Sequence, residues 1–191
     1  MGEWAGILLA AGRGRRFDPG GVRNKLLQRL PGGELVVAAS ARRLLSVFPR
    51  VIAVVPPDDG GVADALRALG CEVTACPDAD SGMGRSLAHA IRHSLPAGGW
   101  LVALGDMPFV RESTLQALRR ALDEGAGIAA PVFEGRRGNP VAFGALHLDA
   151  LLASSGDQGA RRLLAFHPVT EVAVSDPGIL RDIDSPADLA S

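Results

Sequence analysis

A glycine-rich, cationic segment near the start of the chain is well suited to bind a charged ligand. Gly12 and Gly14 follow the apolar run 5–11, and Arg16 and Lys25 come after them. Glycines let backbone N–H groups approach phosphate oxygens closely, and arginine and lysine add charge-assisted hydrogen bonds of roughly 1.5–3 kcal/mol each. The segment predicts an anion site at the end of a buried strand, and a surface loop with solvated arginines is the alternative.

Two common phosphate-binding loops do not fit this segment. A dinucleotide fingerprint needs a third glycine where Phe17 stands, and a Walker-type loop ends in Gly-Lys-Ser or Gly-Lys-Thr, which this sequence lacks. An NAD-dependent oxidoreductase is therefore disfavoured. Between Gly12 and Gly33 there is no clear periodicity, and a loop of that length in a compact domain is usually functional or disordered.

A second candidate is a carboxylate that follows an apolar run. Residues 100–104 predict a buried strand, and Gly105, Asp106 and Pro108 come after it. Open α/β sheets bind ligands at the carboxyl ends of their strands, and the proline fixes the turn that holds the carboxylate there. Such a carboxylate can bind Mg²⁺ between triphosphate oxygens, whereas a helix cap or turn is the ordinary role.

A third segment combines glycines with the start of a helix. Gly82, Met83 and Gly84 lead into the predicted helix 85–95, which carries Ser86. Backbone N–H and C=O groups at the glycines can read the edge of a base, and the serine hydroxyl can add a hydrogen bond. A capped helix start without a ligand is the alternative.

Histidine and cysteine do not indicate a further site. His89 and His93 are four residues apart, but no carboxylate or third histidine is near them in sequence, so we expect packing or solvent-facing roles. Cys71 and Cys76 are too few for a disulfide framework and do not have metal-site spacing. We expect both to be reduced.

An alternation of strands and helices must position these residues. Apolar runs predict strands at 5–11, 51–55, 72–75, 100–104, 127–132 and 169–174. Helical patterns predict helices at 34–48, 59–69, 85–95, 112–124 and 155–166, and a last one from Pro186 with Ser185 as its cap and Asp188 in the capping-box position. A turn at 134–138 predicts that 139–143 returns antiparallel to 127–132. The alternation indicates a doubly wound, mostly parallel sheet.

Length and composition fit one α/β domain. The chain has 191 residues, of which 47% are hydrophobic, and a net charge of −1. A charge so close to zero gives no reason to expect a nucleic-acid partner. A strand occupies the N-terminus where a signal peptide would lie, and no apolar run reaches the ~18 residues of a membrane span. We therefore expect a cytoplasmic enzyme without a membrane partner.

Six phrases, in order along the chain, resemble the motifs of nucleotidyltransferases of the sugar-nucleotide and molybdopterin-nucleotide type. They are Leu-Ala-Ala-Gly-x-Gly-x-Arg at 9–16 with Lys25, Gly-Met-Gly-x-Ser-Leu at 82–87, Leu-Gly-Asp-Met-Pro at 104–108, Gly-Asn-Pro-Val at 138–141, Gly-Asp-x-Gly-Ala-Arg-x-Leu-Leu at 156–164 and Asp-Ile-Asp-Ser-Pro-Ala-Asp-Leu at 182–189. The first, second and fifth are most similar to CTP-using members, the molybdenum cofactor cytidylyltransferases of the MobA-like NTP transferase family. Gly14, Phe17 and the longer segment 18–24 depart from that pattern and bear on the choice of nucleotide.

The resemblance implies a three-layer, Rossmann-like nucleotidyltransferase fold of the α/β class, with a mostly parallel sheet and one antiparallel strand. It implies one domain, 1–191, with a nucleotide-binding part at about 1–110 and an acceptor-binding part at about 111–191.

The resemblance also implies roles for individual residues. Arg16, Lys25 and Asp106 would be catalytic, with Mg²⁺ on Asp106 and on Asp184 as a second ligand, and Asp182 would face the same site. The nucleotide would be bound by Leu9, Ala10, Ala11, Gly12, Arg13, Gly14, Asp78, Gly82, Met83, Gly84 and Ser86. The acceptor would be bound by Gly138, Asn139, Pro140, Asp157 and Arg161.

The implied reaction is Mg²⁺-dependent transfer of CMP from CTP to the phosphate of molybdopterin, which gives the cytosine dinucleotide and pyrophosphate. A molybdoenzyme or its chaperone would then receive the product. Transfer of GMP to molybdopterin, or of a nucleotide to another phosphorylated small molecule, is the alternative within the same class. A non-catalytic module that binds nucleotide or molybdopterin for delivery is the alternative from another class.

Overall fold

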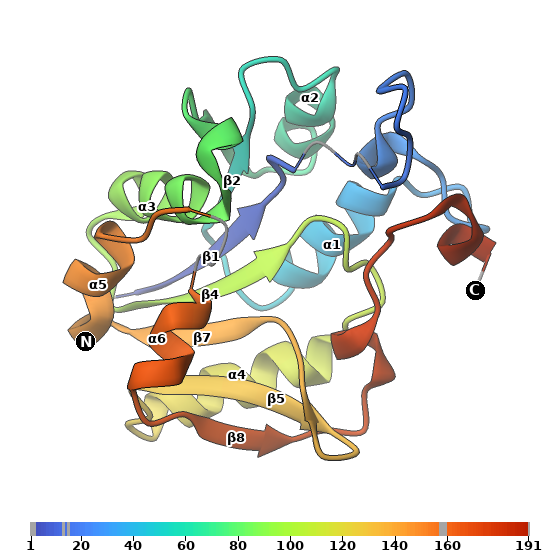
Figure 1. Ribbon diagram of the computed structural model, residues 1–191. Helices are drawn as coiled ribbons and strands as arrows, with labels where there is room; N and C mark the ends of the chain where they lie inside the picture. Colours follow the sequence, from blue (N-terminus) through green and yellow to red (C-terminus); the bar gives the residue numbers. More distant parts are fainter. Residues whose placement is uncertain (1–2, 13, 15, 157–159, 191) are drawn as a thin grey trace.

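One eight-stranded sheet runs through the molecule (Figure 1). The computed structural model describes residues 3–12, 14, 16–156 and 160–190. The strands are β1 (Trp4–Leu9), β2 (Val51–Val55), β3 (Glu72–Ala75), β4 (Gly99–Leu104), β5 (Ile128–Phe133), β6 (Arg136–Arg137), β7 (Val141–Gly144) and β8 (Thr170–Ala173). Their order is β3-β2-β1-β4-β7-β5-β6, and β8 pairs with the other side of β5.

The sheet is mostly parallel, as the sequence predicts. β1 pairs in parallel with β2 and β4, and β5 with β8. β7 lies between β4 and β5 and is antiparallel to both. The return from β5 is not one continuous strand. The Gly138 amide still donates to the Pro131 carbonyl of β5, but the Asn139 amide donates to the Ile179 carbonyl, which separates the short β6 from β7.

Helices cover both faces of the sheet, which makes three layers. They are α1 (Val36–Leu45), α2 (Val62–Arg67), α3 (Met83–Ser94), α4 (Glu112–Asp123), α5 (Leu148–Leu152) and α6 (Arg161–Phe166). Leu8 of β1 packs in the cluster with α1, α2 and α4, whereas Ile7 and Leu9 pack in the cluster with α3, α5 and α6. This alternation follows from the two-residue period of a strand that is buried on both faces.

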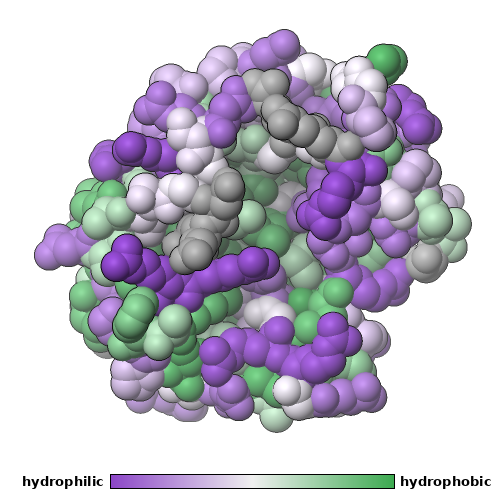
Figure 2. Space-filling model, viewed as in Figure 1, coloured by the Kyte–Doolittle hydropathy of each residue, from purple (hydrophilic) through white to green (hydrophobic). Residues whose placement is uncertain are grey.

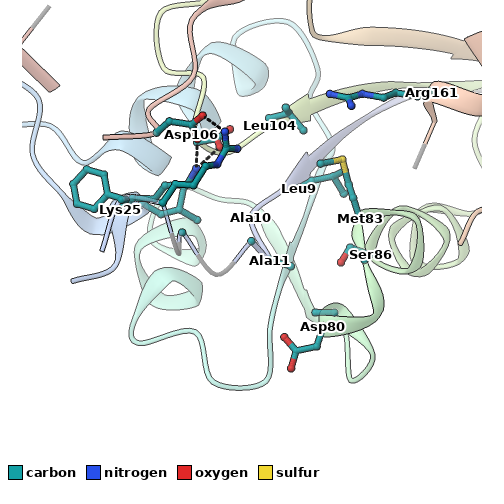
Figure 3. Close-up of a pocket in the computed structure, with 18 residues that line it drawn as sticks. Leu9, Ala10, Ala11, Lys25, Asp80, Met83, Ser86, Leu104, Asp106 and Arg161 are labelled. Carbon is teal, nitrogen blue, oxygen red and sulfur yellow. Dashed lines mark hydrogen bonds and ion pairs between the residues drawn. The ribbon is translucent and has the colours of Figure 1, made fainter. Parts of the chain in front are cut away.

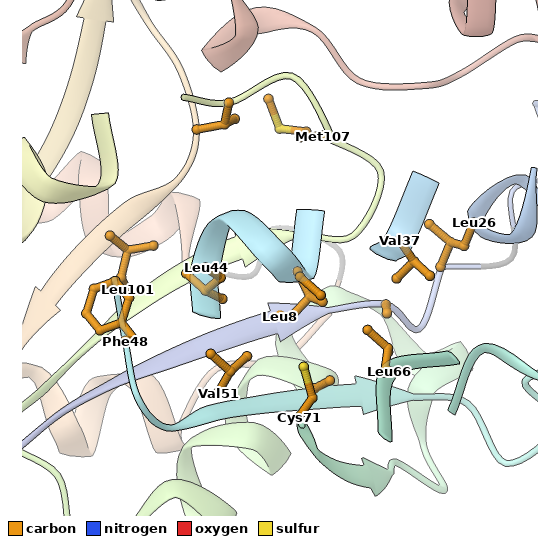
Figure 4. Packing of buried hydrophobic residues seen from close by; sticks show 14 of the residues in the cluster. Leu8, Leu26, Val37, Leu44, Phe48, Val51, Leu66, Cys71, Leu101 and Met107 are labelled. Carbon is orange, nitrogen blue, oxygen red and sulfur yellow. The ribbon is translucent and has the colours of Figure 1, made fainter. Parts of the chain in front are cut away.

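The apolar cluster beneath α1 is closely packed (Figure 4). Leu8, Leu44, Phe48, Leu66 and Leu101 are each at most 1% exposed. Burial of one such side chain contributes about 1.5–3 kcal/mol. The cluster therefore holds β1 and β4 rigidly where their carboxyl ends begin the loops of the site.

One part of the helical layer differs from the sequence prediction. The helix expected at 155–166 begins only at Arg161, and α5 was not predicted as a separate helix. Gly156 has a φ of +66°, which a right-handed helix cannot contain, so the chain turns there before α6.

Cys71 and Cys76 are both free and buried, as expected. Within the part of the chain that the structure describes, no helix is long and apolar enough to cross a membrane.

Candidate active site

A deep cleft lies at the point in the sheet where the order of the strands reverses. The chain runs from β1 outward to β2 and β3 and then returns to place β4 on the other side of β1. Leu9 and Leu104 are partners at the ends of these two strands, and the Gly105 amide donates to the Leu9 carbonyl at 2.9 Å. Such a switch point is where open α/β sheets bind ligands, because the two loops diverge and leave a crevice.

The cleft has a volume of about 650 Å³ (Figures 2 and 3). Figure 2 shows it as a hollow with hydrophilic residues around its rim. It is lined by Leu9, Ala10, Ala11, Gly12, Gly14, Arg16, Phe17, Lys25, Leu26, Ala79, Asp80, Gly82, Met83, Ser86, Leu104, Asp106, Arg161 and Asp184. Segments that are far apart in the sequence therefore share one cavity.

A short 3₁₀ turn, Lys25–Leu27, brings Lys25 into the cleft. The Asn24 side chain caps the turn by accepting a hydrogen bond from the Leu26 amide at 3.0 Å, and Leu26 is buried beneath it. Gly14 has a φ of +58°, and a β-carbon there would lie 3.2 Å from Cγ of Lys25. The glycine therefore supplies both the turn and the space for the lysine side chain.

The residues that depart from the family pattern close this loop. Phe17 is buried against the core, and its amide donates to the Gly14 carbonyl at 2.9 Å. Asp18 accepts hydrogen bonds from the amides of Gly20 and Arg23, which lowers its pKa. The longer segment 18–24 is thus folded onto its own aspartate, and none of its residues lines the cleft.

The charged end of the cleft is built around Lys25 (Figure 3). Its ammonium is 2.6 Å from Oδ2 of Asp106 and 3.7 Å from Oδ1 of Asp184, and it donates to the Ile183 carbonyl at 3.0 Å. Arg16 approaches the other oxygen of Asp184 at 2.5 Å. The cation and both carboxylates therefore face one point in the cleft, although 158 residues separate Lys25 from Ile183.

Three carboxylates at this end could hold a divalent cation. One ligand oxygen from each of Asp106, Asp182 and Asp184 lies within 4.8 Å of the others. The pKa of Asp184 is raised, first by burial and then by the charge of Asp182, while Lys25 and Arg16 act in the opposite direction. Oδ1 of Asp184 is buried and accepts no hydrogen bond from the described residues. Oxygen ligands with excess negative charge fit Mg²⁺ or Mn²⁺.

The C-terminal segment is fixed beside β4 by two sets of contacts. The Ile183 amide donates to the Asp106 carbonyl at 2.9 Å. Oδ2 of Asp188 accepts from the Ser185 hydroxyl at 2.8 Å, the Ser185 amide at 2.7 Å and the Asp184 amide at 3.1 Å, and these hydrogen bonds lower the pKa of Asp188. The bond from the Ser185 amide is the predicted capping-box contact. These backbone bonds set the position of the Asp184 carboxylate.

The other end of the cleft lies at the start of α3, and we call it the neutral end because most of its lining residues (Ala79, Gly82, Met83 and Ser86) are uncharged, with Asp80 as the exception among the described residues. Ser86 is 2% exposed, and its hydroxyl has no hydrogen-bond partner among the described residues. Met83, which is 46% exposed, and Asp80 flank it in Figure 3. A buried hydroxyl without a partner is costly, so this end is suited to a ligand that supplies a hydrogen bond.

Two of the expected nucleotide-binding residues do not line the cleft. The Gly84 amide donates to the Gly156 carbonyl at 2.8 Å, and a β-carbon on Gly84 would lie 2.6 Å from backbone atoms of Ser155. The glycine thus allows two backbones to pack closely, and its amide is not available to a base. Asp78 is exposed and precedes the turn Ala79–Ser81. Arg13, expected in the same set, lies outside the described residues.

Only one described residue of the expected acceptor set lines the cleft. This residue is Arg161, at the start of α6. Gly138 and Asn139 pack against the C-terminal segment, because the Asn139 amide donates to the Ile179 carbonyl and a β-carbon on Gly138 would collide with that same carbonyl. Pro140 does not line the cleft either. Asp157 lies outside the described residues.

Five lining residues were not predicted. They are Phe17, Leu26, Ala79, Asp80 and Leu104. Leu104 is the last residue of β4 and could have been inferred from its place before Gly105. The only sequence signal for Phe17 is that it departs from the motif.

The expected packing or solvent-facing role of the histidines agrees with the structure, since His89 contacts Thr74 Oγ1 at 2.8 Å and His93 contacts the His89 carbonyl at 2.9 Å.

Solved structures with similar folds come from bacteria and archaea. Rv0371c from Mycobacterium tuberculosis H37Rv is 29% identical with a TM-score of 0.80, over 98% of this chain and 95% of that one. A complex of Rv0371C with manganese is 27% identical with a TM-score of 0.73, over 99% and 94%. A nucleotidyl transferase from Methanothermobacter is 26% identical with a TM-score of 0.81, over 97% and 94%.

A family model matches most of the chain. No curated protein matches the chain. The model of the MobA-like NTP transferase domain matches residues 6–172, which include the glycine-rich segment, Lys25 and Asp106. The chain therefore belongs to the MobA-like NTP transferase family of nucleotidyltransferases.

Proposed function

We propose that this protein transfers CMP from CTP to the terminal phosphate of a molybdopterin-type acceptor and releases pyrophosphate. The observation that carries the proposal is the cluster of Lys25, Asp106 and Asp184 at one end of a cleft whose other end holds the unpartnered Ser86 hydroxyl. A nucleoside triphosphate matches both ends of this cleft, because its phosphates are anionic and its base forms hydrogen bonds.

The phosphates would lie at the charged end. The backbone of Gly12 and Gly14 lines the cleft there, with the cationic side chains of Lys25 and Arg16. Lys25 pairs with two carboxylates in the present structure, so a triphosphate would draw its ammonium toward phosphate oxygens. Asp106, Asp182 and Asp184 would hold Mg²⁺, which neutralises charge on the phosphates when it is bound. The manganese complex of a similar protein supports the use of a divalent cation.

The reaction needs positioning more than proton transfer. An oxygen of the acceptor phosphate attacks the α-phosphorus, the bond from that phosphorus to the β-phosphate oxygen breaks, and pyrophosphate leaves with the electron pair. A phosphate monoester is already ionised at neutral pH, so no general base is required. Lys25 and Arg16 would stabilise the charge that develops on pyrophosphate, and Arg161 would attract the acceptor from the opposite wall.

The direct test supplies each of the four nucleoside triphosphates with molybdopterin and Mg²⁺ and measures pyrophosphate release. We expect release with CTP and formation of the cytosine dinucleotide. Release with GTP instead would support GMP transfer to the same acceptor. No release with any of the four nucleotides would contradict the proposal.

The alternative of a delivery module makes a different prediction for Asp106. A protein that only carries nucleotide or molybdopterin has no need of the metal carboxylate, so Asp106→Asn would leave delivery to a partner enzyme intact. Loss of product formation in this variant, with CTP still bound, would exclude the delivery role.

A further inference from the structure

A second cavity borders the acid cluster from the side of the C-terminal segment. It has a volume of about 370 Å³ and is lined by Phe109, Leu180, Arg181, Asp182 and Asp188. We call these five residues the Phe109–Arg181 subsite. Asp182 belongs both to this cavity and to the acid cluster, where its carboxylate lies within 4.8 Å of a ligand oxygen of Asp106 and Asp184.

The guanidinium of Arg181 contacts an aromatic ring, and its hydrogen-bond donors are not used by the described residues. It lies over the Phe109 ring, with its central carbon 4.2 Å from the ring centroid. None of the described residues accepts a hydrogen bond from it. The N–H groups of this guanidinium are therefore available to a ligand that enters the cavity.

The walls of the subsite are locked in place. Asp176, which is 1% exposed, accepts hydrogen bonds from the Arg111 amide at 2.8 Å, the Thr114 hydroxyl at 2.7 Å and the Gly178 amide at 2.9 Å. A β-carbon on Gly178 would collide with the backbone of Phe109. The loop that carries Phe109 and the segment that carries Arg181 are therefore joined before any ligand arrives.

The cavity also offers hydrogen-bond acceptors. The three hydrogen bonds that Asp188 accepts all end on Oδ2, which leaves Oδ1 free of partners among the described residues. The Asp182 carboxylate is exposed at the other side. Two carboxylates against one guanidinium disfavour a purely anionic ligand such as free phosphate.

We infer that the Phe109–Arg181 subsite binds the flat heterocycle of a pterin-type acceptor. One edge of a pterin carries amino and ring N–H donors, which match the carboxylates, and its carbonyl oxygen matches the guanidinium. A face of the ring matches the apolar side chain of Leu180. The inference rests on the proposed function. The subsite would hold the heterocycle of the acceptor, and the phosphate of the acceptor would extend past Asp182 to the acid cluster.

Binding of neopterin, an uncharged fluorescent pterin, tests the subsite without turnover. We expect saturable quenching of its fluorescence by the wild-type protein and at least ~10-fold weaker binding by Arg181→Met, since both the stack and the donors are lost. Arg181→Lys keeps the charge but not the flat stack and should also bind more weakly. Arg162→Met is the matched control, because Arg162 lies over Phe166 at 5.9 Å outside the cavity, and it should bind neopterin normally.

Two results would overturn the subsite. One is the absence of saturable neopterin binding by the wild-type protein, and the other is equal binding by folded Arg181→Met, checked by its thermal unfolding. Steady-state pyrophosphate release separates this failure from failure of the proposed function. Normal turnover with an unchanged acceptor KM in Arg181→Met rejects the subsite alone. Neopterin binding that depends on Arg181, without turnover on any triphosphate, rejects the proposed function alone.

Discussion

The two ends of the main cleft differ in whether their polar groups have partners within the described residues. At the charged end, Lys25 and Arg16 neutralise Asp106 and Asp184, so each of these groups has a partner before any ligand binds. At the neutral end, the Ser86 hydroxyl is buried without a described partner. The comparison indicates that ligand binding exchanges partners at the charged end and supplies a missing partner at the neutral end.

The largest effect is expected at the charged end, from Asp106→Asn. The change keeps the shape of the side chain but removes a metal-binding charge and the partner of Lys25, so kcat should fall by about three orders of magnitude. Pyrophosphate release measures the effect, and thermal unfolding shows that the variant is folded. Turnover within a few fold of wild type would remove Asp106 from the site.

A second test at this end is Lys25→Gln. The variant loses the cation that we expect to move onto the triphosphate, and the KM for CTP should rise by about 10- to 100-fold with a smaller change in kcat. Arg120→Gln, on the exposed face of α4, removes a cation away from the cleft and should leave both values unchanged. An unchanged KM in Lys25→Gln would mean that Lys25 only pairs with the carboxylates.

The neutral end is tested by two buried serines on α3. Ser86→Ala should raise the KM for CTP by roughly 2- to 10-fold, the value of one hydrogen bond, without lowering stability, because this hydroxyl has no partner among the described residues to lose. Ser94→Ala should do the opposite, since the Ser94 hydroxyl accepts the Trp100 indole N–H at 2.7 Å. We expect about 1–3 kcal/mol of lost stability by urea unfolding and a normal KM. The same phenotype in both variants would contradict the distinction between the two sites.

The smallest effect concerns the support of the charged end by Asp188. Hydrogen bonds from Ser185 lower the pKa of Asp188 below 3.8 in the folded protein, so its carboxylate stabilises the fold above pH 3.8 and loses that contribution as the pH falls through the lowered pKa. Asp188→Asn should therefore be less stable than wild type at pH 7, and the difference should shrink by pH 3. Asp149→Asn, exposed on α5, is the control. A difference that is the same at pH 7 and pH 3 would show that ionisation of Asp188 plays no part.

The sequence predicts the structure best where a single residue type is needed for a local feature, such as the end of a strand, a turn or a helix cap. The strand that ends before Asp106, the loop glycine Gly14 and the capping box of Ser185 and Asp188 follow from local patterns, and the structure contains all three. The sequence was less informative where a glycine serves packing between distant segments. Gly84 and Gly138 belong to motif phrases, yet each contacts backbone that no local pattern specifies, Ser155 and Ile179.

Local sequence patterns also do not predict the contact between Asp184 and Lys25 at the charged end. Asp184 meets Lys25 because the C-terminal segment passes β4 and bonds to the Asp106 backbone (Figure 1). Periodicity locates elements along the chain, whereas this contact depends on how the last segment crosses the sheet edge. The same crossing creates the Phe109–Arg181 subsite.

The most direct test of the account is the structure of the protein crystallised with CTP and Mg²⁺. We predict the triphosphate against Gly12 and Gly14, the Lys25 ammonium on a phosphate oxygen, the cation on Asp106 and the cytosine within hydrogen-bond distance of Ser86. A nucleotide bound outside this cleft, or a cation coordinated without Asp106, would contradict it.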